Sequence, residues 1–211
     1  MAKLISENLT NNNLCILCYT TTDGQMLSIK PDSFDAKIVA HTYTDIGRII
    51  FGTPITKIHD YAFYDRSTLT SITIPDNVTT IGECAFSMCA SLTNVTIGNS
   101  VTTIEERAFE KCRNLTSVII GDSVTTIGFG AFYVCKSLSR ITIGKNVRKI
   151  DMKAFQGCSN IDTIICCATT PPRLYISSDS TCSSFKKFET LVVPTGCEEA
   201  YANSDWGQYL E

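Results

Sequence analysis

Residues 69–91 read LTSITIPDNVTTIGECAFSMCAS, and three further stretches repeat this pattern without a gap. The four copies begin at Leu69, Leu92, Leu115 and Leu138, a spacing of 23 residues, and each reads approximately L-T-x-[IV]-[TI]-I-[PG]-x-x-V-x-x-I-x-x-x-A-F-x-x-C-x-[SN]. A fixed period of about 20 to 50 residues is typical of solenoids and other repeat arrays. The repeat therefore decides the fold. It also argues against an enzyme, because a stack of near-identical coils has few places for a unique catalytic cluster.

One coil can be read in order from its first leucine. Within Leu69–Ile74, the apolar residues Ile72 and Ile74 are two positions apart, which is the period of a strand. The Thr and Ile residues of this segment also suit a half-buried strand. Pro75–Asn77 then turns the chain, and Val78–Ile81 forms a second short extended segment. We expect Ala85–Phe86 on a short helical or 3-10 turn, and Cys89 closes the coil. One such unit cannot bury its apolar face alone, so neighbouring coils must stack.

Stacking places every apolar position above its copy in the next coil. This predicts a column of buried phenylalanines and a second column of buried cysteines. Each buried phenylalanine contributes roughly 1.5 to 3 kcal/mol through the hydrophobic effect, and a free cysteine behaves as a small buried hydrophobe. The phenylalanines are Phe63, Phe86, Phe109, Phe132 and Phe155, and the cysteines are Cys89, Cys112, Cys135 and Cys158. We interpret these cysteines as a structural ladder of inert thiols.

Few residues remain as candidates for chemistry, although the chain has eleven cysteines and two histidines. Zinc sites need ligands that converge in a tetrahedron, whereas a column with one cysteine per coil cannot converge. Cys15 and Cys18 form an isolated C-x-x-C motif, whose side chains face opposite ways in a strand. No hydrolase, zinc-protease or phosphate-loop motif occurs. We therefore predict no enzymatic activity, no metal and no cofactor.

The repeat extends backwards by one atypical coil and is preceded by a predicted cap. Counting 23 residues back from the first regular copy places Ile46 in the leucine slot and Arg66 in the cysteine slot. Further upstream, Leu14–Tyr19 and Gln25–Ile29 flank a Thr-Asp-Gly turn and predict a β-hairpin, and Lys37–Tyr43 predicts a third strand. A solenoid needs caps because its exposed apolar end would otherwise pair with another chain. The predicted regions are an N-terminal tail at residues 1–13, a β cap at residues 14–45 and the solenoid at residues 46–168.

Downstream, the repeat fades into an Ala-Thr-Thr-Pro-Pro stretch. The loop Pro171–Ser184 is rich in Ser, Thr and Pro, and we expect it to be the most mobile part of the chain. Phe188–Val193 predicts a strand, and Glu198–Ala202 predicts a short helix. Trp206 and Tyr209 are bulky residues suited to covering the last coil. These features predict a C-terminal loop and cap at residues 169–211.

Composition and charge limit the classes of partner. The formal net charge is -3 and the basic residues are scattered, so the chain lacks the basic patch of a nucleic-acid-binding protein. No apolar stretch approaches the roughly 18 residues of a membrane-spanning helix. Met1–Asn13 lacks the apolar core of a signal peptide. Either the protein is cytoplasmic, or an export signal is missing from this chain.

The coil Leu69–Ser91 resembles the BspA-like, or treponemal-type, leucine-rich repeat. The signature A-F-x-x-C of that subclass stands at Ala85, Phe86 and Cys89 and recurs in the three other copies. The resemblance implies a right-handed stack of leucine-rich-repeat coils. It also implies a bacterial or protist protein, at the cell surface or secreted, that binds other macromolecules, often in adhesion. It implies no catalytic residue and no shared ligand motif.

The same resemblance places the first strand of each coil on the concave side of the solenoid, which is the usual binding surface. Residues that alternate with the buried ones on these strands form an outward column. The column predicts a shallow, mostly uncharged platform, rich in hydroxyl groups, for a protein or a glycan. The alternative interpretation is that Thr and Ser simply suit exposed strand positions. The candidate residues are Arg48, Ser71, Thr73, Asn94, Thr96, Ser117, Ile119, Arg140, Thr142 and Thr163.

The predicted fold is an α/β-type repeat solenoid, mostly β, of about five coils, with an N-terminal β-hairpin cap and a C-terminal strand and helix cap. The predicted function is non-catalytic recognition of a macromolecule by a monomeric protein at the cell surface or outside the cell. Two alternatives stay open. The missing export signal and the many thiols favour an intracellular scaffold or assembly module, and an accessory domain of a larger enzyme is the other.

Overall fold

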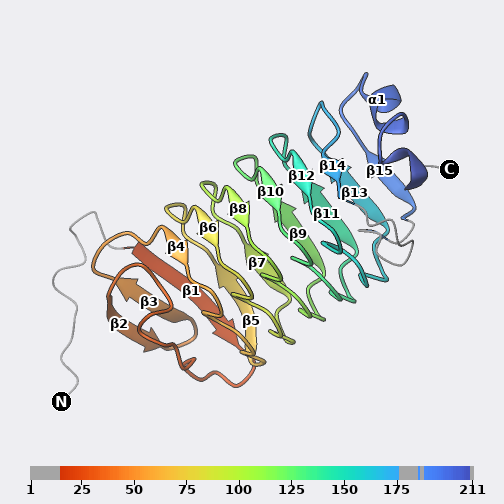
Figure 1. The fold of residues 1–211 in the computed structure, drawn as a ribbon. Coiled ribbons are helices and arrows are strands. Elements are labelled where there is room, and N and C mark those ends of the chain that lie inside the picture. Colours follow the sequence, from red (N-terminus) through yellow and green to blue (C-terminus); the bar gives the residue numbers. More distant parts are fainter. Residues whose placement is uncertain (1–14, 176–184, 186–187, 210–211) are drawn as a thin grey trace, which may run out of the picture.

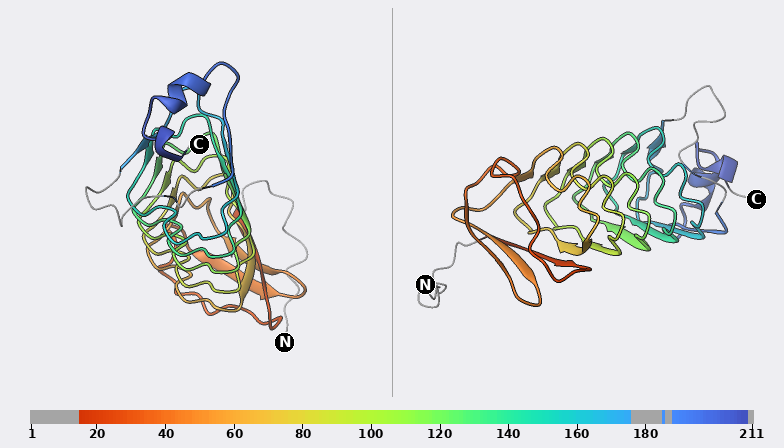
Figure 2. Two further views of the ribbon diagram at one scale, coloured as in Figure 1. Left: turned by 90° about the vertical axis from the view of Figure 1, so that its right-hand side faces the viewer. Right: turned by 90° about the horizontal axis from the view of Figure 1, so that it is seen from below.

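The computed structural model describes residues 15–175, 185 and 188–209, which form an elongated stack of coils (Figure 1). Three strands close the N-terminal end and two short helices close the C-terminal end (Figures 1 and 2). The predicted tail at residues 1–13 lies outside the described residues, as does the part of the predicted mobile loop from residue 176 to residue 184. The mostly β solenoid predicted from the repeat is confirmed.

The first strand of each coil lies parallel to its copy in the next coil. Between β5 and β7, and from β9 to β13, residues 23 apart are paired, as in Ser71 with Asn94 and Arg140 with Thr163, so the repeat period sets the register there. The last pair departs from the period, because Thr163 of β13 pairs with Thr190 of β15. In the described part of the chain, β7 and β9 belong to different sheets. The strands are β5 (Leu69–Thr73), β7 (Asn94–Thr96), β9 (Ser117–Ile120), β11 (Arg140–Ile143), β13 (Thr163–Cys166) and β15 (Thr190–Val192).

A second parallel sheet is formed by strands of only two residues, one from each coil. In each of these strands the second side chain is buried and the first is partly or fully exposed. The sheet therefore covers one side of the core with a single row of apolar residues. Its strands are β4 (Lys57–Ile58), β6 (Thr80–Ile81), β8 (Thr103–Ile104), β10 (Thr126–Ile127), β12 (Lys149–Ile150) and β14 (Arg173–Leu174).

The segment around Phe86 is a series of tight turns closed by i→i−3 bonds, as from Ala85 N–H to the Gly82 carbonyl at 3.2 Å. Of the predicted short helical or 3-10 turn, only the hydrogen-bond spacing of the 3-10 turn is therefore present, and no helix forms. Cys84 and Met88 have positive φ angles of 51° and 64°, which a helix does not contain. The N–H groups of Cys84, Phe86 and Met88 donate to carbonyl oxygens of the next coil at 2.9, 2.7 and 2.8 Å. In a helix these N–H groups would bond within the same segment, along the helix axis. In the turns they bond to the next coil instead, and these bonds link neighbouring coils. We call the outer surface of these turns the turn face, which comprises residues 60–66, 83–89, 106–112, 129–135 and 152–158.

The phenylalanine column forms the centre of the core. Neighbouring rings from Phe63 to Phe155 are stacked, with centroids 5.0 to 5.2 Å apart and interplanar angles between 3° and 9°. Phe185 continues the stack at 5.0 Å from Phe155. Phe34 packs edge-on against Phe63 at 5.9 Å, and Phe188 packs edge-on against Phe185 at 6.0 Å. Edge-on rings therefore close the stack at both ends.

The four cysteines of the second column are fully buried and free of disulfides. Each thiol Sγ lies 3.1 to 3.2 Å from the carbonyl oxygen of a phenylalanine in the preceding coil, as Cys89 does from Phe63. Burial raises the pKa of Cys89 from 9.0 to about 12 and holds the pKa of Cys112 and of Cys135 well above the ordinary value. The predicted column of buried, unbridged cysteines is confirmed, and the inertness of their thiols stays a prediction.

The N-terminal cap is an antiparallel sheet whose pairing differs from the predicted hairpin. Its strands are β1 (Cys15–Thr21), β2 (Ile38–Tyr43) and β3 (Gly47–Phe51), and the sheet order is β2-β3-β1-β5-β7. Gln25–Ile29 is not a strand, so the hairpin predicted between it and Leu14–Tyr19 is wrong. The N–H of Leu27 donates to the hydroxyl of Tyr19 at 3.1 Å, a side-chain bond in place of a strand ladder. The third predicted strand is confirmed as β2.

β1 lies between the atypical first coil and the regular solenoid. It pairs antiparallel with both β3 and β5, so β3 does not stack on β5 as the repeat predicted. Ile46, expected in the buried slot of Leu69, is 39% exposed, whereas Leu69 is fully buried. The coil becomes regular from the buried Ile55 onwards, and its Phe63 joins the ring stack. The domain boundary between residues 45 and 46 stays a prediction.

The C-terminal cap contains the predicted helix and covers the last coil. Helix α1 spans Glu198–Ala202, and the 3-10 helix η2 spans Gly207–Tyr209. Trp206 is fully buried, and its indole Nε1 donates to the carbonyl oxygen of Pro172 at 2.8 Å. The predicted strand before the helix is confirmed as β15, with three residues. Because β14 and β15 pair with β12 and β13, the solenoid continues for one coil beyond the fading of the sequence pattern.

Candidate functional site

The predicted binding column lies on the outer surface of the first strands. Its members alternate with buried residues such as Ile72, Val118 and Ile141, so they face away from the core. We call this surface the strand face. It comprises the predicted residues Ser71, Thr73, Asn94, Thr96, Ser117, Ile119, Arg140, Thr142 and Thr163, together with Ile165, which lies on the same side of β13 as Thr163.

The structure divides the strand face into two groups, because no ladder joins β7 to β9 in the described part of the chain. The first group lies on β5 and β7, next to the N-terminal cap. The second group lies on β9, β11 and β13, where residues 23 apart form two rows. The first group pairs Ser71 with Asn94 and Thr73 with Thr96, and the rows of the second are Ser117, Arg140 and Thr163 beside Ile119, Thr142 and Ile165.

The cap engages part of the first group. The hydroxyl oxygens of Thr20 on β1 and Ser71 on β5 lie 2.6 Å apart. Arg48 was expected directly beside Ser71, one coil earlier in the column. Instead, β1 separates β3 from β5, and Arg48 aligns with Thr73 through Cys18. Arg48 therefore belongs to the cap sheet, and its expected place beside Ser71 is wrong because β1 is inserted.

The second group presents exposed apolar side chains near a cation. Ile119 is 68% exposed, the largest value among the exposed large hydrophobic residues described. Its row continues through Thr142 and the half-buried Ile165 to Val192 on β15, and Val192 is 46% exposed. The guanidinium of Arg140, in the neighbouring row, takes part in none of the ion pairs of the described residues. Protein interfaces commonly contain exposed aliphatic side chains beside an arginine.

The threonines that directly precede three strands of the second sheet, β6, β8 and β10, have a structural role. The hydroxyls of Thr79, Thr102 and Thr125 donate to backbone carbonyl oxygens of the preceding coil at 3.1, 3.1 and 3.3 Å. The threonine in each coil thus binds the backbone of the coil before it. These bonds occupy the hydroxyl donors of Thr79, Thr102 and Thr125, so these three threonines are not counted among the candidate binding residues.

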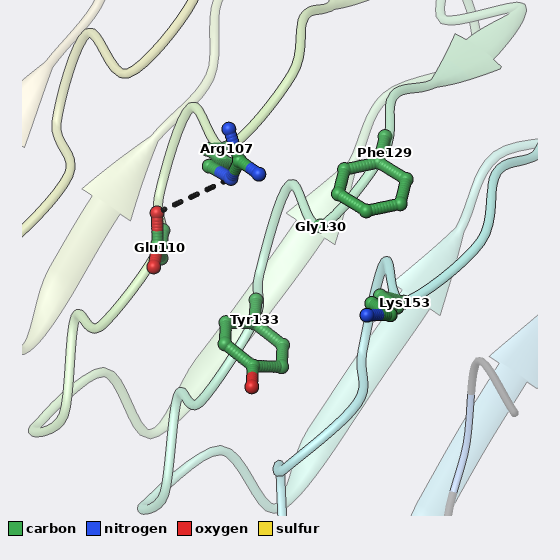
Figure 3. A pocket seen from close by; sticks show the side chains of 6 residues that line it. All are labelled: Arg107, Glu110, Phe129, Gly130, Tyr133 and Lys153. Atoms are coloured by element: carbon green, nitrogen blue, oxygen red, sulfur yellow. Dashed lines mark ion pairs between the residues drawn. The ribbon is translucent and has the colours of Figure 1, made fainter. Parts of the chain in front are cut away.

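The turn face carries a pocket that sequence reasoning missed. Its volume is about 210 Å³, and Figure 3 shows its side chains arranged around Gly130. The equivalent positions in the coils before and after hold Arg107 and Lys153, so the absent side chain leaves a recess between two long ones. The interruption of this 23-residue column by glycine was the available signal. The lining residues are Arg107, Glu110, Phe129, Gly130, Tyr133 and Lys153.

Charges of both signs surround the pocket. Arg107 pairs with Glu106 at 2.8 Å and with Glu110 at 3.7 Å. Its Cζ lies 5.4 Å from the centroid of the Phe129 ring, and the Nζ of Lys153 lies 5.8 Å from the same centroid. Lys153 takes part in no ion pair among the described residues. Its ammonium is therefore the cation at the pocket that lacks a carboxylate partner.

The two histidines lie in contacts with the N-terminal cap. The Nε2 atom of His41 lies 2.6 Å from the hydroxyl of Tyr19, and burial lowers the pKa of His41. The Nδ1 atom of His59 lies 2.8 Å from the carbonyl oxygen of Asp32. Within the described ranges, no group of three His, Cys, Asp or Glu side chains is placed to hold a metal ion. None of the helices described there is long and apolar enough to cross a bilayer.

Three solved structures are similar to the chain. The leucine-rich repeat protein TpLRR of T. pallidum has 23% identity and a TM-score of 0.57 over 67% of each chain. The pneumococcal vaccine antigen PcpA has 20% identity and a TM-score of 0.59 over 71% of this chain and 37% of its own. A leucine rich cell surface protein from Faecalibacterium prausnitzii has 29% identity and a TM-score of 0.50 over 63% of this chain and 33% of its own. The chain thus spans about a third of the length of the last two.

The sequence carries the repeat of one family along most of its length. The BspA type Leucine rich repeat region matches residues 40–198 in six copies. No curated protein matches the chain. The matched region includes the regular coils, the strand face and the turn-face pocket. The chain therefore belongs to the BspA-type leucine-rich repeat family.

Proposed function

We propose that this protein recognises a macromolecular partner, a protein or a glycan, through the second group of the strand face. Membership of a leucine-rich repeat family supports a binding role, and a solenoid offers an extended surface with evenly spaced side chains. The leading observation is Ile119, which is 68% exposed. The fold does not require an apolar residue there, because the coils on either side hold Thr96 and Thr142 at the same position.

We further propose that the protein acts as a monomer at the cell surface or outside the cell, in adhesion-type binding. One similar structure is that of a cell surface protein, which supports this location. The mostly uncharged, hydroxyl-rich strand face suits many weak polar contacts around the exposed Ile119. No cofactor is needed for recognition of this kind.

Arrays of extracellular proteins and of glycans test the proposal when they are probed with the wild type and with Ile119→Asp. The change removes the exposed apolar side chain and puts in its place a charge that a partner must desolvate, so signals that depend on Ile119 should weaken roughly tenfold or more. The triple replacement of Asn94, Arg140 and Thr142 by alanine should weaken the same signals.

The control is Val39→Asp, the same kind of change at a residue that is 53% exposed on β2, outside the strand face. It should leave the array signals unchanged. Equal binding by wild type and Ile119→Asp, or the absence of any bound array member, would contradict the proposal.

A further inference from the structure

We propose that the turn-face pocket at Gly130 binds a carboxylate side chain from an acidic segment of a protein partner. The turn face is distinct from the strand face, so this inference does not depend on the proposed role of the strand face. Three observations carry it: the residue types of the turn face, the shape of the recess, and the distribution of charge around it (Figure 3).

The turn face carries the large side chains that protein interfaces favour. Tyr61 and Tyr64 are 49% and 40% exposed at its N-terminal end, and Arg107, Phe129 and Tyr133 follow toward the pocket. Tyrosine and arginine are enriched among residues that dominate binding energy. The strand face, by contrast, is built mainly from threonine and serine. The residue types that contribute most to protein binding, tyrosine and arginine, therefore lie mainly on the turn face.

The recess is shaped for one side chain. Gly130 stands in a column whose other members are Tyr61, Cys84, Arg107 and Lys153, all with φ between 49° and 59°. The backbone at this position thus accepts large residues, and the recess arises only from the missing side chain. A volume of about 210 Å³ admits a side chain but no folded element.

The charges around the recess favour an anion. Glu106 and Glu110 hold Arg107 through Nη1 and Nε, which leaves Nη2 outside these ion pairs. Lys111 pairs with Glu110 at 3.3 Å, and Lys153 pairs with no carboxylate among the described residues. Three cations thus face two carboxylates, and the remaining positive charge lies at Lys153. A carboxylate that enters beside Gly130 meets Lys153 and the free edge of Arg107 in charge-assisted hydrogen bonds.

The Phe129 ring favours a protein carboxylate over a saccharide. A sugar ring would need an open aromatic face, whereas the Phe129 ring already has Arg107 and Lys153 within 5.4 and 5.8 Å of its centroid. A neutral glycan would also gain little from the net positive charge. An aspartate or glutamate side chain matches both the charge and the volume.

Amide NMR spectra of the full chain, recorded during a titration with acetyl-glutamate N-methylamide, test the site directly. The amides of Gly130, Tyr133 and Lys153 should shift, and the shifts should diminish at high salt because charge pairing is screened. The uncharged isostere acetyl-glutamine N-methylamide should leave them in place. Equal shifts with both compounds, or no shift with either, would overturn the proposal.

Two variants distinguish an effect on binding at the pocket from an effect on the stability of the fold. Gly130→Tyr plugs the recess with a residue that the same column already holds at position 61 with a φ of 58°. Lys153→Gln removes the unpaired charge and keeps most of the side chain. Both should weaken binding of the glutamate compound roughly tenfold or more. Lys145→Gln, at a 62% exposed side chain paired with Asp122, should have no effect.

A titration with methyl glucuronide tests the alternative ligand class, an acidic glycan. If methyl glucuronide shifts the same amides at lower concentration than the glutamate compound does, the site is one for an acidic glycan and the proposal is overturned. Wild-type affinity in both Gly130→Tyr and Lys153→Gln, with native spectra elsewhere, also overturns it. Loss of binding in Lys153→Gln alone, with an unchanged thermal midpoint, supports it even if the plugged variant folds poorly.

Discussion

The buried thiols couple the stability of the protein to alkaline pH. Burial raises the pKa of Cys89 from 9.0 to about 12 and keeps the pKa of Cys112 and of Cys135 well above 9.0. The folded state therefore retains protons that the unfolded chain loses above a pH of about 9. Stability should be fully present below that pH and decline as the pH rises through the folded-state pKa values, by about 1.4 kcal/mol per pH unit for each thiol. Urea unfolding at a series of alkaline pH values measures this slope.

The control for the alkaline slope is the combined replacement of Cys89, Cys112 and Cys135 by alanine. That variant should be less stable at neutral pH, because each thiol also lies near a phenylalanine carbonyl. Its free energy of unfolding should nevertheless vary much less with pH, and an unchanged slope would show that other groups cause the decline. The sequence predicted the buried column from its spacing. It did not predict the carbonyl partner, because that contact depends on turns whose geometry the sequence reading took for a helical turn.

At the scale of elements, the regular strands followed from the sequence and the N-terminal cap did not. A constant period fixes which residues pair, as it does for Arg140 with Thr163. The partners of β1 lie far from it in the sequence, and no local pattern marks them. The local Asp-Gly turn favoured a hairpin, but β1 packs its Tyr19 ring over Gly47 on β3. Tertiary packing thus outweighed local turn propensity.

The substitution Gly47→Ala tests the contact that places β1. An added Cβ would overlap the ring of Tyr19, so the ring or the strand must shift. We expect a loss of about 1 to 3 kcal/mol in the free energy of unfolding, as is usual for overpacking. The matched control is Gly121→Ala, where an added Cβ has nothing within 4 Å, and its stability should stay within about 0.5 kcal/mol of wild type. Equal stability of the two variants by urea unfolding would contradict this role of Gly47.

Across the whole molecule, one stack of rings joins both caps. The sequence predicted its regular members and the capping role of Trp206, because these follow from period and residue size. It did not predict Phe185, whose distance in sequence from Phe155 departs from the repeat. Of the two candidate sites, likewise, one was predicted from the sequence and the other was not. The strand face follows from alternation, whereas the pocket depends on the side chain that Gly130 lacks beside its neighbours Arg107 and Lys153.

Because each coil contacts only its neighbours, damage to one cap should remain at that end of the solenoid. Trp206 is fully buried against Phe185, with ring centroids 5.4 Å apart, so Trp206→Ala should cost about 3 to 5 kcal/mol locally. Hydrogen exchange should then accelerate at the amides of β13 and β11 and stay slow at those of β5. Phe109→Ala, in the middle of the stack, serves as the comparison and should accelerate exchange in coils on both sides of it. Uniform acceleration along the chain in Trp206→Ala would mean that the solenoid unfolds as one cooperative unit, because loss of the cap would then lower the free energy of opening equally in every coil.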